Sequence, residues 1–275
     1  MLMTMKRIFL LLAIFFTSSC SAGDIDFKSM EKSEKAFNER QRKNLIIYMP
    51  LEDLFPDLAA RALAKAAGKG DVSEVDRLVR EGASVDVRGT KGATSLFYAL
   101  RSSNIDGFKR LLELGADPNL VFEDSSVIHL SVRHEDASYL RAVLDHEGDP
   151  NLSAGKPSET PLFLTIGVGG TDKKLAREML LDAGADINAI TGSELVTGIP
   201  MGGKTPLMTA ANLVRFDIVY EFLELGGDYR LKDDSGRTLS DRVKSYEGRF
   251  APDSEQIEHF QKVQAWLSKR GAYGG

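Results

Sequence analysis

Apolar side chains recur along the chain at the spacing of an amphipathic helix. Two triplets at positions i, i+3 and i+4 are Val75, Leu78 and Val79 and, in the following segment, Phe108, Leu111 and Leu112. This spacing places each triplet on one face of a helix. A single helix pair cannot bury such a face by itself, so neighbouring segments are expected to stack against each other.

A short motif stands in front of each of these helical segments. Its copies are Thr94-Ser95-Leu96-Phe97, Ser126-Val127-Ile128-His129, Thr160-Pro161-Leu162-Phe163 and Thr205-Pro206-Leu207-Met208, and Thr238 opens a last copy without proline. A threonine hydroxyl can cap the first turn of a helix, and proline fits that turn because its missing N–H is not needed there. The motif therefore predicts one helix start per repeat.

A second motif, which begins with glycine, recurs at the same spacing along the chain. Its copies are Gly82-Ala83-Ser84, Gly115-Ala116-Asp117, Gly148-Asp149, Gly184-Ala185-Asp186 and Gly226-Gly227-Asp228. The leading glycine can adopt the left-handed conformation that ends a helix. Asn119, Asn151 and Asn188 follow three of these markers at a fixed offset. We expect one helix end and one connecting loop in each repeat.

These features together resemble the ankyrin repeat. The resemblance implies an all-α solenoid of about five helix-turn-helix repeats with β-hairpin loops. The repeats would cover residues 61–250, with an insertion at 189–203 and helical caps at 45–60 and 251–275. In this family the histidine at the motif position of His129 bonds the backbone of a neighbouring repeat, so its role is expected to be structural.

The last predicted helix carries its own apolar stripe. Ile257, Phe260, Val263 and Leu267 lie at helical spacing, and Trp266 adjoins them. A stripe after the final repeat is expected to cover the exposed end of the stack. Trp266 is therefore interpreted as part of this cap and not as a ligand contact.

The amino terminus has the layout of a secretory signal. Lys6 and Arg7 precede the apolar run from Ile8 to Phe16, which is too short to span a bilayer, and Cys20 follows small residues. This resembles the lipobox of bacterial lipoproteins, although Thr17 stands where leucine is usual. The resemblance implies a signal peptide at 1–19, a lipidated Cys20 and a tether at 20–44. The alternative is an ordinary signal peptide with an incidental cysteine.

Localisation follows from the same resemblance. The residues after the cysteine, Ser21 and Ala22, differ from the aspartate that retains enterobacterial lipoproteins in the inner membrane. The resemblance therefore implies the periplasm, with the anchor in the inner leaflet of the outer membrane. In the chain beyond the signal, the polar residues up to 44 are interpreted as a solvated linker.

The amino-acid composition excludes several kinds of functional site. The 275 residues include 35 Lys+Arg, 40 Asp+Glu, one cysteine and four histidines, with a formal net charge of -5. One cysteine excludes an intramolecular disulfide and a multi-cysteine metal site, and the acidic balance disfavours nucleic-acid binding.

The stretch from Gly198 to Thr205 fits the phosphate-loop pattern G-x-x-x-x-G-K-[ST], but no buried strand precedes it. We expect no cofactor, no metal and no enzymatic activity.

Ankyrin arrays bind proteins through hairpin tips and the inner helices, so the resemblance transfers contact positions by register. The expected partner-binding residues are Thr90, Lys91, Arg101, Phe122, Glu123, Arg133, His134, Lys156, Glu159, Lys204, Asn212, Asp234 and Arg237, with Leu195, Ile199 and Met201 from the insertion. Phe122, Arg101 and Arg133 are the expected hot spots, since aromatic and arginine side chains dominate many interfaces. The alternative for Phe122 is that it folds back onto its own repeat.

Bacterial ankyrin lipoproteins of this size resemble immunity partners of type VI secretion effectors, notably phospholipases. That resemblance implies a 1:1 complex in which this chain neutralises a toxic lipase, with membrane contact through the lipid anchor alone. The alternative function is a housekeeping scaffold or adaptor that stabilises a periplasmic enzyme. Both functions rest on family analogy.

Overall fold

The chain divides into two compact units, Met1–Met49 and Pro50–Gly275. The computed structural model describes residues 46–167, 173–193, 195–196, 199–200, 202–251 and 254–273. In the first unit the described residues form one 3-10 turn, η1 (Ile46–Tyr48). The predicted signal peptide, Cys20 and the tether lie outside the described residues. Within the described part of the chain, no helix is both long enough and apolar enough to cross a membrane.

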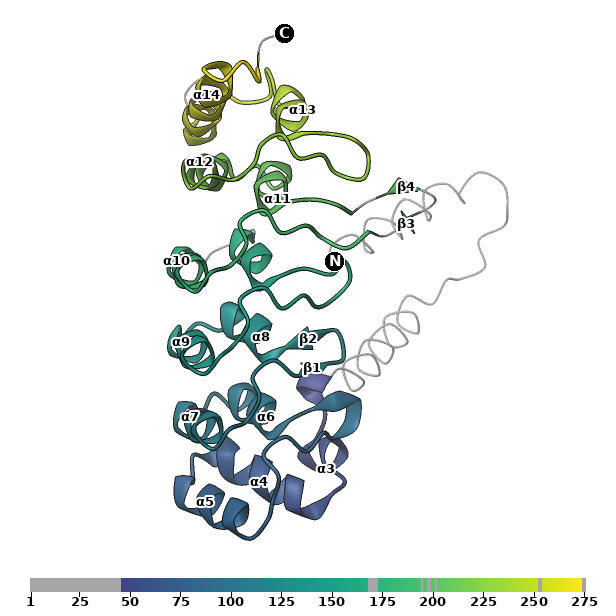
Figure 1. Cartoon of the computed structure of the whole chain (residues 1–275), viewed down its shortest axis with the longest axis vertical. Helices are drawn as coiled ribbons and strands as arrows, with labels where there is room; N and C mark the ends of the chain where they lie inside the picture. Colours follow the sequence, from purple (N-terminus) through teal and green to yellow (C-terminus); the bar gives the residue numbers. More distant parts are fainter. Residues whose placement is uncertain are drawn as a thin grey trace, which may run out of the picture. The chain divides into compact units, whose positions relative to one another are not determined.

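The second unit is a stack of helix pairs in two rows (Figure 1). The inner row consists of α4 (Leu58–Lys69), α6 (Ser95–Arg101), α8 (Val127–Arg133), η3 (Pro161–Ile166), α11 (Pro206–Asn212) and α13 (Leu239–Lys244). The outer row consists of α5 (Val72–Arg80), α7 (Ile105–Glu113), α9 (Ser138–Asp145), α10 (Lys174–Asp182), α12 (Phe216–Glu224) and α14 (Glu255–Ser268). Each inner helix contacts the next one, as expected for a solenoid.

This arrangement confirms the predicted all-α ankyrin solenoid, with one change at the amino end. The first inner helix begins at Leu58, where the Asp57 carboxylate accepts a hydrogen bond from the Ala60 N–H at 2.8 Å. The predicted boundary at residue 61 therefore falls inside this helix. The cap in front of it is reduced to the single turn α3 (Leu51–Leu54).

The predicted threonine caps are present in three of the repeats. Thr94 accepts a hydrogen bond from the Phe97 N–H at 3.1 Å, and Thr205 accepts one from the Met208 N–H at 3.2 Å. Thr238 forms a reciprocal capping box with Asp241. Each cap satisfies a backbone donor that the first helical turn leaves free. The motif at Thr160 behaves differently, because it opens the 3-10 helix η3 without a side-chain cap.

The glycine-led markers end the outer helices as predicted in all but one repeat. Gly115 has φ 88° and Gly184 has φ 90°, in the left-handed region. In the third repeat this position is held by Glu147, with φ 62°, and the expectation for Gly148 was wrong. The structure aligns Glu147-Gly148-Asp149 with the three-residue markers elsewhere, so the sequence marker is one residue out of register.

The regularly spaced asparagines connect consecutive repeats. Asn119 donates to the Glu147 carbonyl at 2.9 Å and accepts from the Asp149 N–H at 2.7 Å. Asn151 makes the equivalent bonds to the Gly184 carbonyl at 3.0 Å and from the Asp186 N–H at 2.7 Å. Each amide thereby satisfies two backbone groups of the next loop, which holds the hairpins at a fixed spacing.

Two short hairpins carry β-ladder pairing. The strands β1 (Val121–Phe122) and β2 (Ser125–Ser126) pair antiparallel in the third repeat. The insertion contains β3 (Leu195–Val196) and β4 (Ile199–Pro200), also antiparallel, with Leu195 opposite Pro200. The inserted segment therefore extends the hairpin of its repeat.

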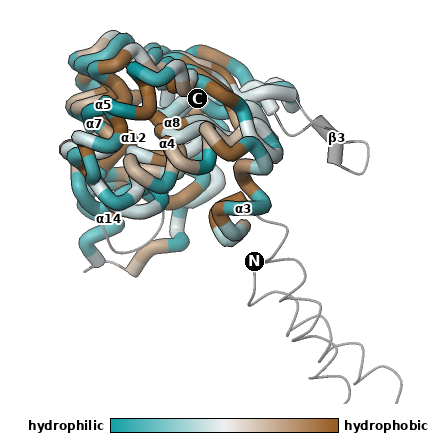
Figure 2. Tube along the Cα trace, turned by 90° about the horizontal axis from the view of Figure 1, so that it is seen from below, coloured by the Kyte–Doolittle hydropathy of each residue, from teal (hydrophilic) through white to brown (hydrophobic). Residues whose placement is uncertain are grey.

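Apolar residues of the two rows face each other and form the core. Hydrophobic and hydrophilic positions alternate along the helices, as Figure 2 shows in a view along the stack. In the second repeat Phe108 and Leu111 are fully buried, whereas Leu78 and Val79 of the first repeat are only half-buried. Among the described residues no repeat precedes the first one in the stack, which explains this difference.

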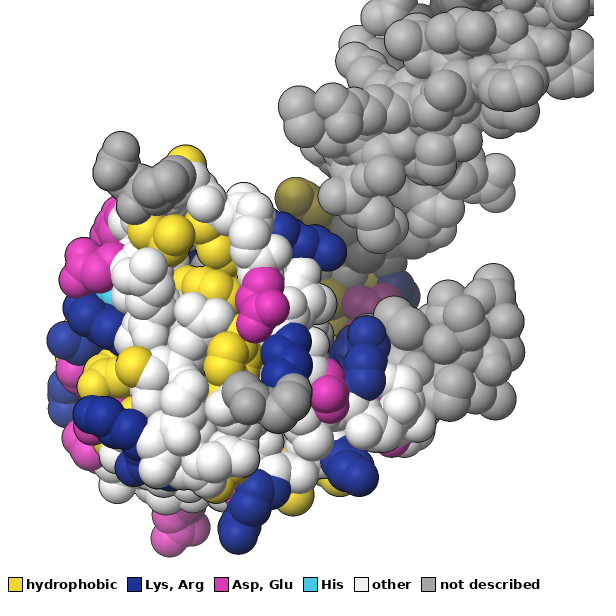
Figure 3. All heavy atoms as spheres, turned by 90° about the horizontal axis from the view of Figure 1, so that it is seen from above, with side chains coloured by type: hydrophobic (Ala, Val, Ile, Leu, Met, Phe, Trp, Pro, Cys, Tyr) yellow, Lys and Arg dark blue, Asp and Glu magenta, His cyan; other side chains and the backbone are white. Residues whose placement is uncertain are grey.

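Helix α14 covers the carboxyl end of the stack, as its apolar stripe predicted. Phe260, Val263 and Leu267 are buried against Phe216 and other core residues of the last repeats. Trp266 donates from Nε1 to Glu224 Oε1 at 2.6 Å and packs edge-on against Tyr229, so its expected role in the cap is confirmed. Charged side chains lie around this end of the molecule, with small hydrophobic groups between them (Figure 3).

Gly107 allows α7 to pack directly on the backbone of α4. A Cβ atom at this position would overlap the carbonyl oxygen of Ala67 and lie 2.8 Å from the Ala67 Cα.

Replacing Gly107 with alanine is expected to lower the free energy of unfolding by about 1–3 kcal/mol, although alanine is the better helix former. Urea unfolding followed by circular dichroism measures this change. Lys109→Ala on the exposed face of α7 is the control and should change stability by less than about 0.5 kcal/mol. A stabilised Gly107→Ala protein would contradict this packing.

Candidate functional site

The candidate contact residues fall on two structural positions that together we call the inner surface. Arg101, Arg133 and Asn212 are the last residues of α6, α8 and α11. His134 directly follows α8, and the remaining positions lie in the loops and hairpins that connect an outer helix to the next inner helix. In Figure 1 these connections all lie on the same side of the stack, beyond the inner row. The register taken from the family therefore selects residues from one side of the molecule.

Most of these side chains are accessible. The exposed residues are Lys91, Glu123, Arg133, Lys156, Asn212, Asp234 and Arg237. The half-buried residues are Thr90, Arg101, His134, Glu159 and Lys204. For Leu195 and Ile199 the structure describes the backbone pairing alone, and Met201 lies outside the described residues. The inner surface is thus polar and of mixed charge.

Phe122 is not part of the accessible surface. Its side chain is 1% exposed, and its ring centroid lies 4.7 Å from that of Phe97 in α6. The expectation of an exposed aromatic hot spot at this hairpin was therefore wrong. The alternative of folding onto its own repeat is also incomplete, because Phe97 belongs to the preceding repeat. The strand alternation turns Phe122 inward and leaves the adjacent Glu123 outside.

Several inner-surface residues are held by interactions within the chain. Lys91 forms an ion pair with Glu123 of the next hairpin, and the guanidinium of Arg101 lies 4.7 Å from the centre of the Tyr98 ring. His134 accepts a hydrogen bond from the Asp136 N–H at 3.0 Å, and its ring lies tilted against that of Tyr139, with the centroids 4.3 Å apart. Such contacts restrict side-chain rotation before binding and reduce the entropy that binding must remove.

His129 has the structural role that its motif position implied. Its Nδ1 lies 2.7 Å from the Ser126 hydroxyl, and its Nε2 lies 2.9 Å from the carbonyl oxygen of Glu159 in the next repeat. Burial lowers the pKa of His129 more than this carbonyl bond raises it. The imidazole connects two hairpins, and both of its ring nitrogens have a partner within the chain.

The residues of the phosphate-loop lookalike serve the hairpin and the following helix. The Lys204 N–H donates to Thr191 Oγ1 at 3.1 Å, and the Gly203 N–H donates to the Thr191 carbonyl at 3.1 Å. The Thr205 hydroxyl caps α11. Because two of the backbone N–H groups already have partners in the chain, the geometry differs from a loop whose N–H groups converge on a phosphate.

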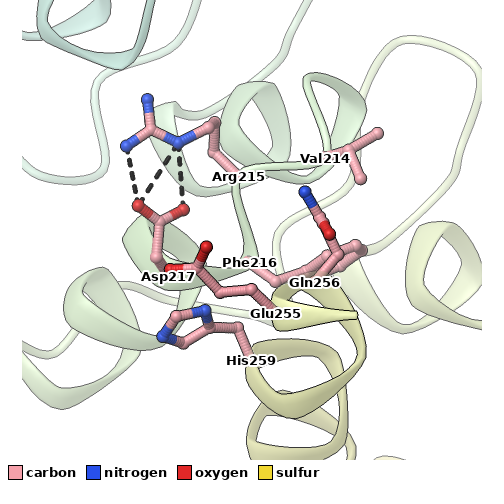
Figure 4. A pocket seen from close by; sticks show the side chains of 7 residues that line it. All are labelled: Val214, Arg215, Phe216, Asp217, Glu255, Gln256 and His259. Carbon is pink, nitrogen blue, oxygen red and sulfur yellow. Dashed lines mark hydrogen bonds and ion pairs between the residues drawn. The ribbon is translucent and has the colours of Figure 1, made fainter. Parts of the chain in front are cut away.

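A hollow of about 160 Å³ lies where α12 and α14 begin (Figure 4). The Arg215 guanidinium pairs there with the Asp217 carboxylate at 2.6 Å, and His259 and Glu255 form the opposite wall. Burial raises the pKa of Asp217, but the hydrogen bond and charge of Arg215 outweigh burial, so the pKa is lowered overall. Arg215 and Asp217 neutralise each other in this hollow, and we assign the pair a structural role at the start of α12.

Two buried ion pairs were missed by the sequence analysis. Arg177 is 3% exposed and binds both carboxylate oxygens of Glu221, which joins α10 to α12. Asp233 and Arg242 are paired in the last hairpin, with side chains 2% and 3% exposed. A charged residue in a helix pattern looks solvent-facing in the sequence. For the second pair the sequence held one signal: Asp233 is followed by Ser235 and Gly236, and residues of these types are typical of a turn in which the aspartate bonds to the backbone.

Among the residues that the structure describes, no group of three or more His, Cys, Asp or Glu side chains could hold a metal ion. The inner surface also presents separate charged residues spread over several repeats. Such an arrangement suits contact with an extended protein surface.

Comparisons with known proteins agree with the architecture. A family model of three ankyrin repeat copies matches residues 44–121. Protein PhlB of Serratia liquefaciens is 32% identical over 161 residues, which are 56% of this chain and 63% of PhlB. The chain thus spans less than two thirds of the length of this relative.

Solved structures match over a larger share of the chain. An ankyrin repeat domain from Acinetobacter baumannii has a TM-score of 0.59 at 22% identity and covers 77% of this chain and 98% of its own. A structure of a predatory endopeptidase from Bdellovibrio bacteriovorus in complex with an immunity protein gives a TM-score of 0.55 at 19% identity, over 73% of this chain and 97% of the matched chain. The capped helix pairs, the asparagine-linked hairpins and these matches together show that the chain has the fold of an ankyrin-repeat domain.

Proposed function

We propose that this protein is a lipid-anchored binding module of the periplasm that neutralises a toxic enzyme by holding it in a 1:1 complex. The proposed partner class is a phospholipase effector of type VI secretion. The observation that carries the proposal is the inner surface, where exposed charged side chains from consecutive repeats stand on a rigid scaffold. Ankyrin repeats are protein-binding modules, and the family resemblance would put the contacts of such a module on this surface.

The Bdellovibrio structure supports the proposed mode of action. It contains an endopeptidase together with an immunity protein, and the chain shares its fold with a component of that structure. A chain with this fold thus occurs in a complex of an enzyme with an immunity protein. In the proposed mechanism, the inner surface covers the entrance of the effector's active site and excludes its substrate.

The anchor has a physical role in this proposal. Lipidation of Cys20 would concentrate the protein at the membrane that a phospholipase attacks. A shared surface raises the effective concentration of the two proteins and speeds capture without any additional contact. Charge complementarity between the inner surface and the effector would further raise the association rate.

Charge reversal on the inner surface is expected to weaken the complex. The Arg101→Glu, Arg133→Glu double variant should lower affinity for the effector at least about tenfold, because arginines at the centre of an interface contribute strongly to binding. Isothermal titration calorimetry measures this change. The matched control is Arg141→Glu, which makes the same change of charge on an exposed residue of the outer helix α9. Equal losses in both variants, or none in the double variant, would show that another face binds.

The biological test uses a candidate effector, a secreted lipase from the same organism. We expect periplasmic expression of the lipase alone to arrest growth, and co-expression of this protein to restore it. Equal killing with and without the protein rules out immunity. If the lipase is harmless and becomes more stable or more active in the presence of this protein, the function is that of an envelope scaffold.

A further inference from the structure

A cavity of about 270 Å³ opens between the hairpins of the third and fourth repeats. Its polar lining includes Asp124, Ser125, His129, Arg133, Lys156 and Glu159. The volume is below the roughly 300–1,000 Å³ that is typical of small-molecule sites. A cavity of this size on a protein-binding surface fits one side chain of a partner.

Glu159 is the half-buried charge of this cavity. Its backbone is held by two hydrogen bonds with Ala154, both at 3.0 Å, and its carbonyl is 2.9 Å from His129 Nε2. The carboxylate is half-buried, and among the described residues none forms an ion pair or a hydrogen bond with it. The charges of Arg133 and Lys204 act on it from a longer distance, but burial outweighs them and its pKa is raised overall. A partly desolvated carboxylate without a partner gains more from a bound cation than a fully solvated one does.

Ser125 supplies a second unused polar group. Its hydroxyl is buried and has no hydrogen-bond partner in the structure. Buried polar groups normally find a partner, so this hydroxyl is available to a ligand that enters the cavity. A hydroxyl can accept a hydrogen bond from a cationic donor.

The two cations of the cavity are of a different kind. Arg133 and Lys156 are exposed, and their long side chains can turn into solvent at little cost. The Glu159 carboxylate is half-buried, and its backbone is bonded to Ala154 of the same hairpin and to His129 of the preceding repeat, so it leaves the cavity less readily than the two exposed side chains do. The sign of charge that the cavity accepts is therefore set by Glu159. An incoming carboxylate would meet this half-buried negative charge, whereas an incoming cation would neutralise it.

We propose that this cavity receives a basic side chain of the bound protein, arginine or lysine, with Glu159 as its counter-ion and Ser125 Oγ as a second acceptor. The inference rests on the proposed function in requiring a protein partner. Arginine fits best, because its planar guanidinium can donate two parallel hydrogen bonds to one carboxylate. Burial raises the pKa of Glu159, and a bound guanidinium would lower it and keep the group ionised.

The test uses a model compound, so that it does not depend on the partner. N-acetyl-argininamide is titrated into the ¹⁵N-labelled full chain, and backbone amide shifts are followed. We expect saturable shifts centred on Ala154, Lys156 and Glu159. Glu159→Gln should weaken this binding about tenfold, because it removes one charge-assisted pair. The control is Glu135→Gln, an exposed carboxylate in the loop that follows α8, which should leave the affinity unchanged.

A second probe checks the sign of the charge. N-acetyl-glutamic acid amide should not produce saturable shifts at these residues. Preferential binding of this acidic probe, or unchanged affinity for the arginine probe in a folded Glu159→Gln protein, overturns the proposal. Circular dichroism establishes that the variant is folded.

The two proposals can fail separately. If the effector binds with full affinity but the arginine probe does not bind, the cavity assignment is wrong and the immunity function stands. If the probe binds as expected but no effector is bound, the cavity chemistry is correct and the immunity function is wrong.

Discussion

Replacing Phe122 with alanine is expected to destabilise the repeat array by roughly 3–5 kcal/mol, the usual cost of removing a buried phenylalanine side chain. Phe122 is 1% exposed and packs against Phe97 across the interface between the second and third repeats. Its removal takes away apolar burial and leaves a cavity between the hairpin and α6. The free energy of unfolding, measured by urea titration, reports the loss.

The neighbouring residue provides the matched control. Glu123 follows Phe122 directly, is exposed, and forms a surface ion pair with Lys91. Glu123→Ala should therefore cost no more than about 1 kcal/mol. If Phe122→Ala were as mild as this control while reducing affinity for a partner, the ring would have to be an exposed contact and the packing described above would be wrong.

Replacing Asp233 with asparagine is expected to have an effect of similar size, because it leaves the Arg242 guanidinium buried without a counter-charge. Asp233 also accepts hydrogen bonds from the Ser235 hydroxyl at 2.6 Å and from the Arg237 N–H at 2.9 Å. Removing one member of a buried ion pair typically costs about 3–5 kcal/mol. The double variant Asp233→Asn, Arg242→Met should recover part of this loss, since no charge then remains buried.

The same pair predicts a distinct dependence on pH. Burial alone would raise the pKa of Asp233, but hydrogen bonds from Ser235 and Arg237 and the charge of Arg242 hold it at about 2. The ordinary aspartate value in an unfolded chain is about 3.9. A depressed pKa in the folded state stabilises the fold above pH 4, and this contribution is lost as the pH falls from about 4 to 2.

Urea midpoints measured between pH 7 and pH 2 test this dependence. The stability of the wild type should fall more steeply below pH 4 than that of Asp233→Asn, by on the order of 2 kcal/mol. Other carboxylates titrate in both proteins and cancel in the comparison. Parallel curves for the two proteins would show that Asp233 is not held in its ionised form by the fold.

Local patterns in the amino-acid sequence predicted much of the fold. Helix starts at Thr94, Thr205 and Thr238 were predicted because a cap is decided within one turn of chain. The apolar stripe of α14 predicted a covering helix, since periodicity reports which face needs burial. The register of the repeats then brought Arg101 and Arg133 correctly to the ends of inner helices.

The two predictions that were wrong, for Phe122 and for Gly148, failed for the same physical reason. Phe122 was assigned to the surface by repeat position alone, but whether its ring points outward depends on the partner strand and on Phe97, a residue of another repeat. The left-handed residue of the third repeat is Glu147 and not Gly148, because the fit of the whole loop overrides the preference of one residue.

The sequence by itself determined the repeat, its helix pairs, its caps and the side of the molecule on which contacts are expected, because these depend on interactions over a few residues repeated in register. Only the tertiary structure decided which charges are buried and which are available. Asp233 with Arg242 and Arg177 with Glu221 are internal, whereas the Glu159 carboxylate is left without a partner in a cavity. These outcomes depend on how residues from different repeats meet, which local spacing does not specify.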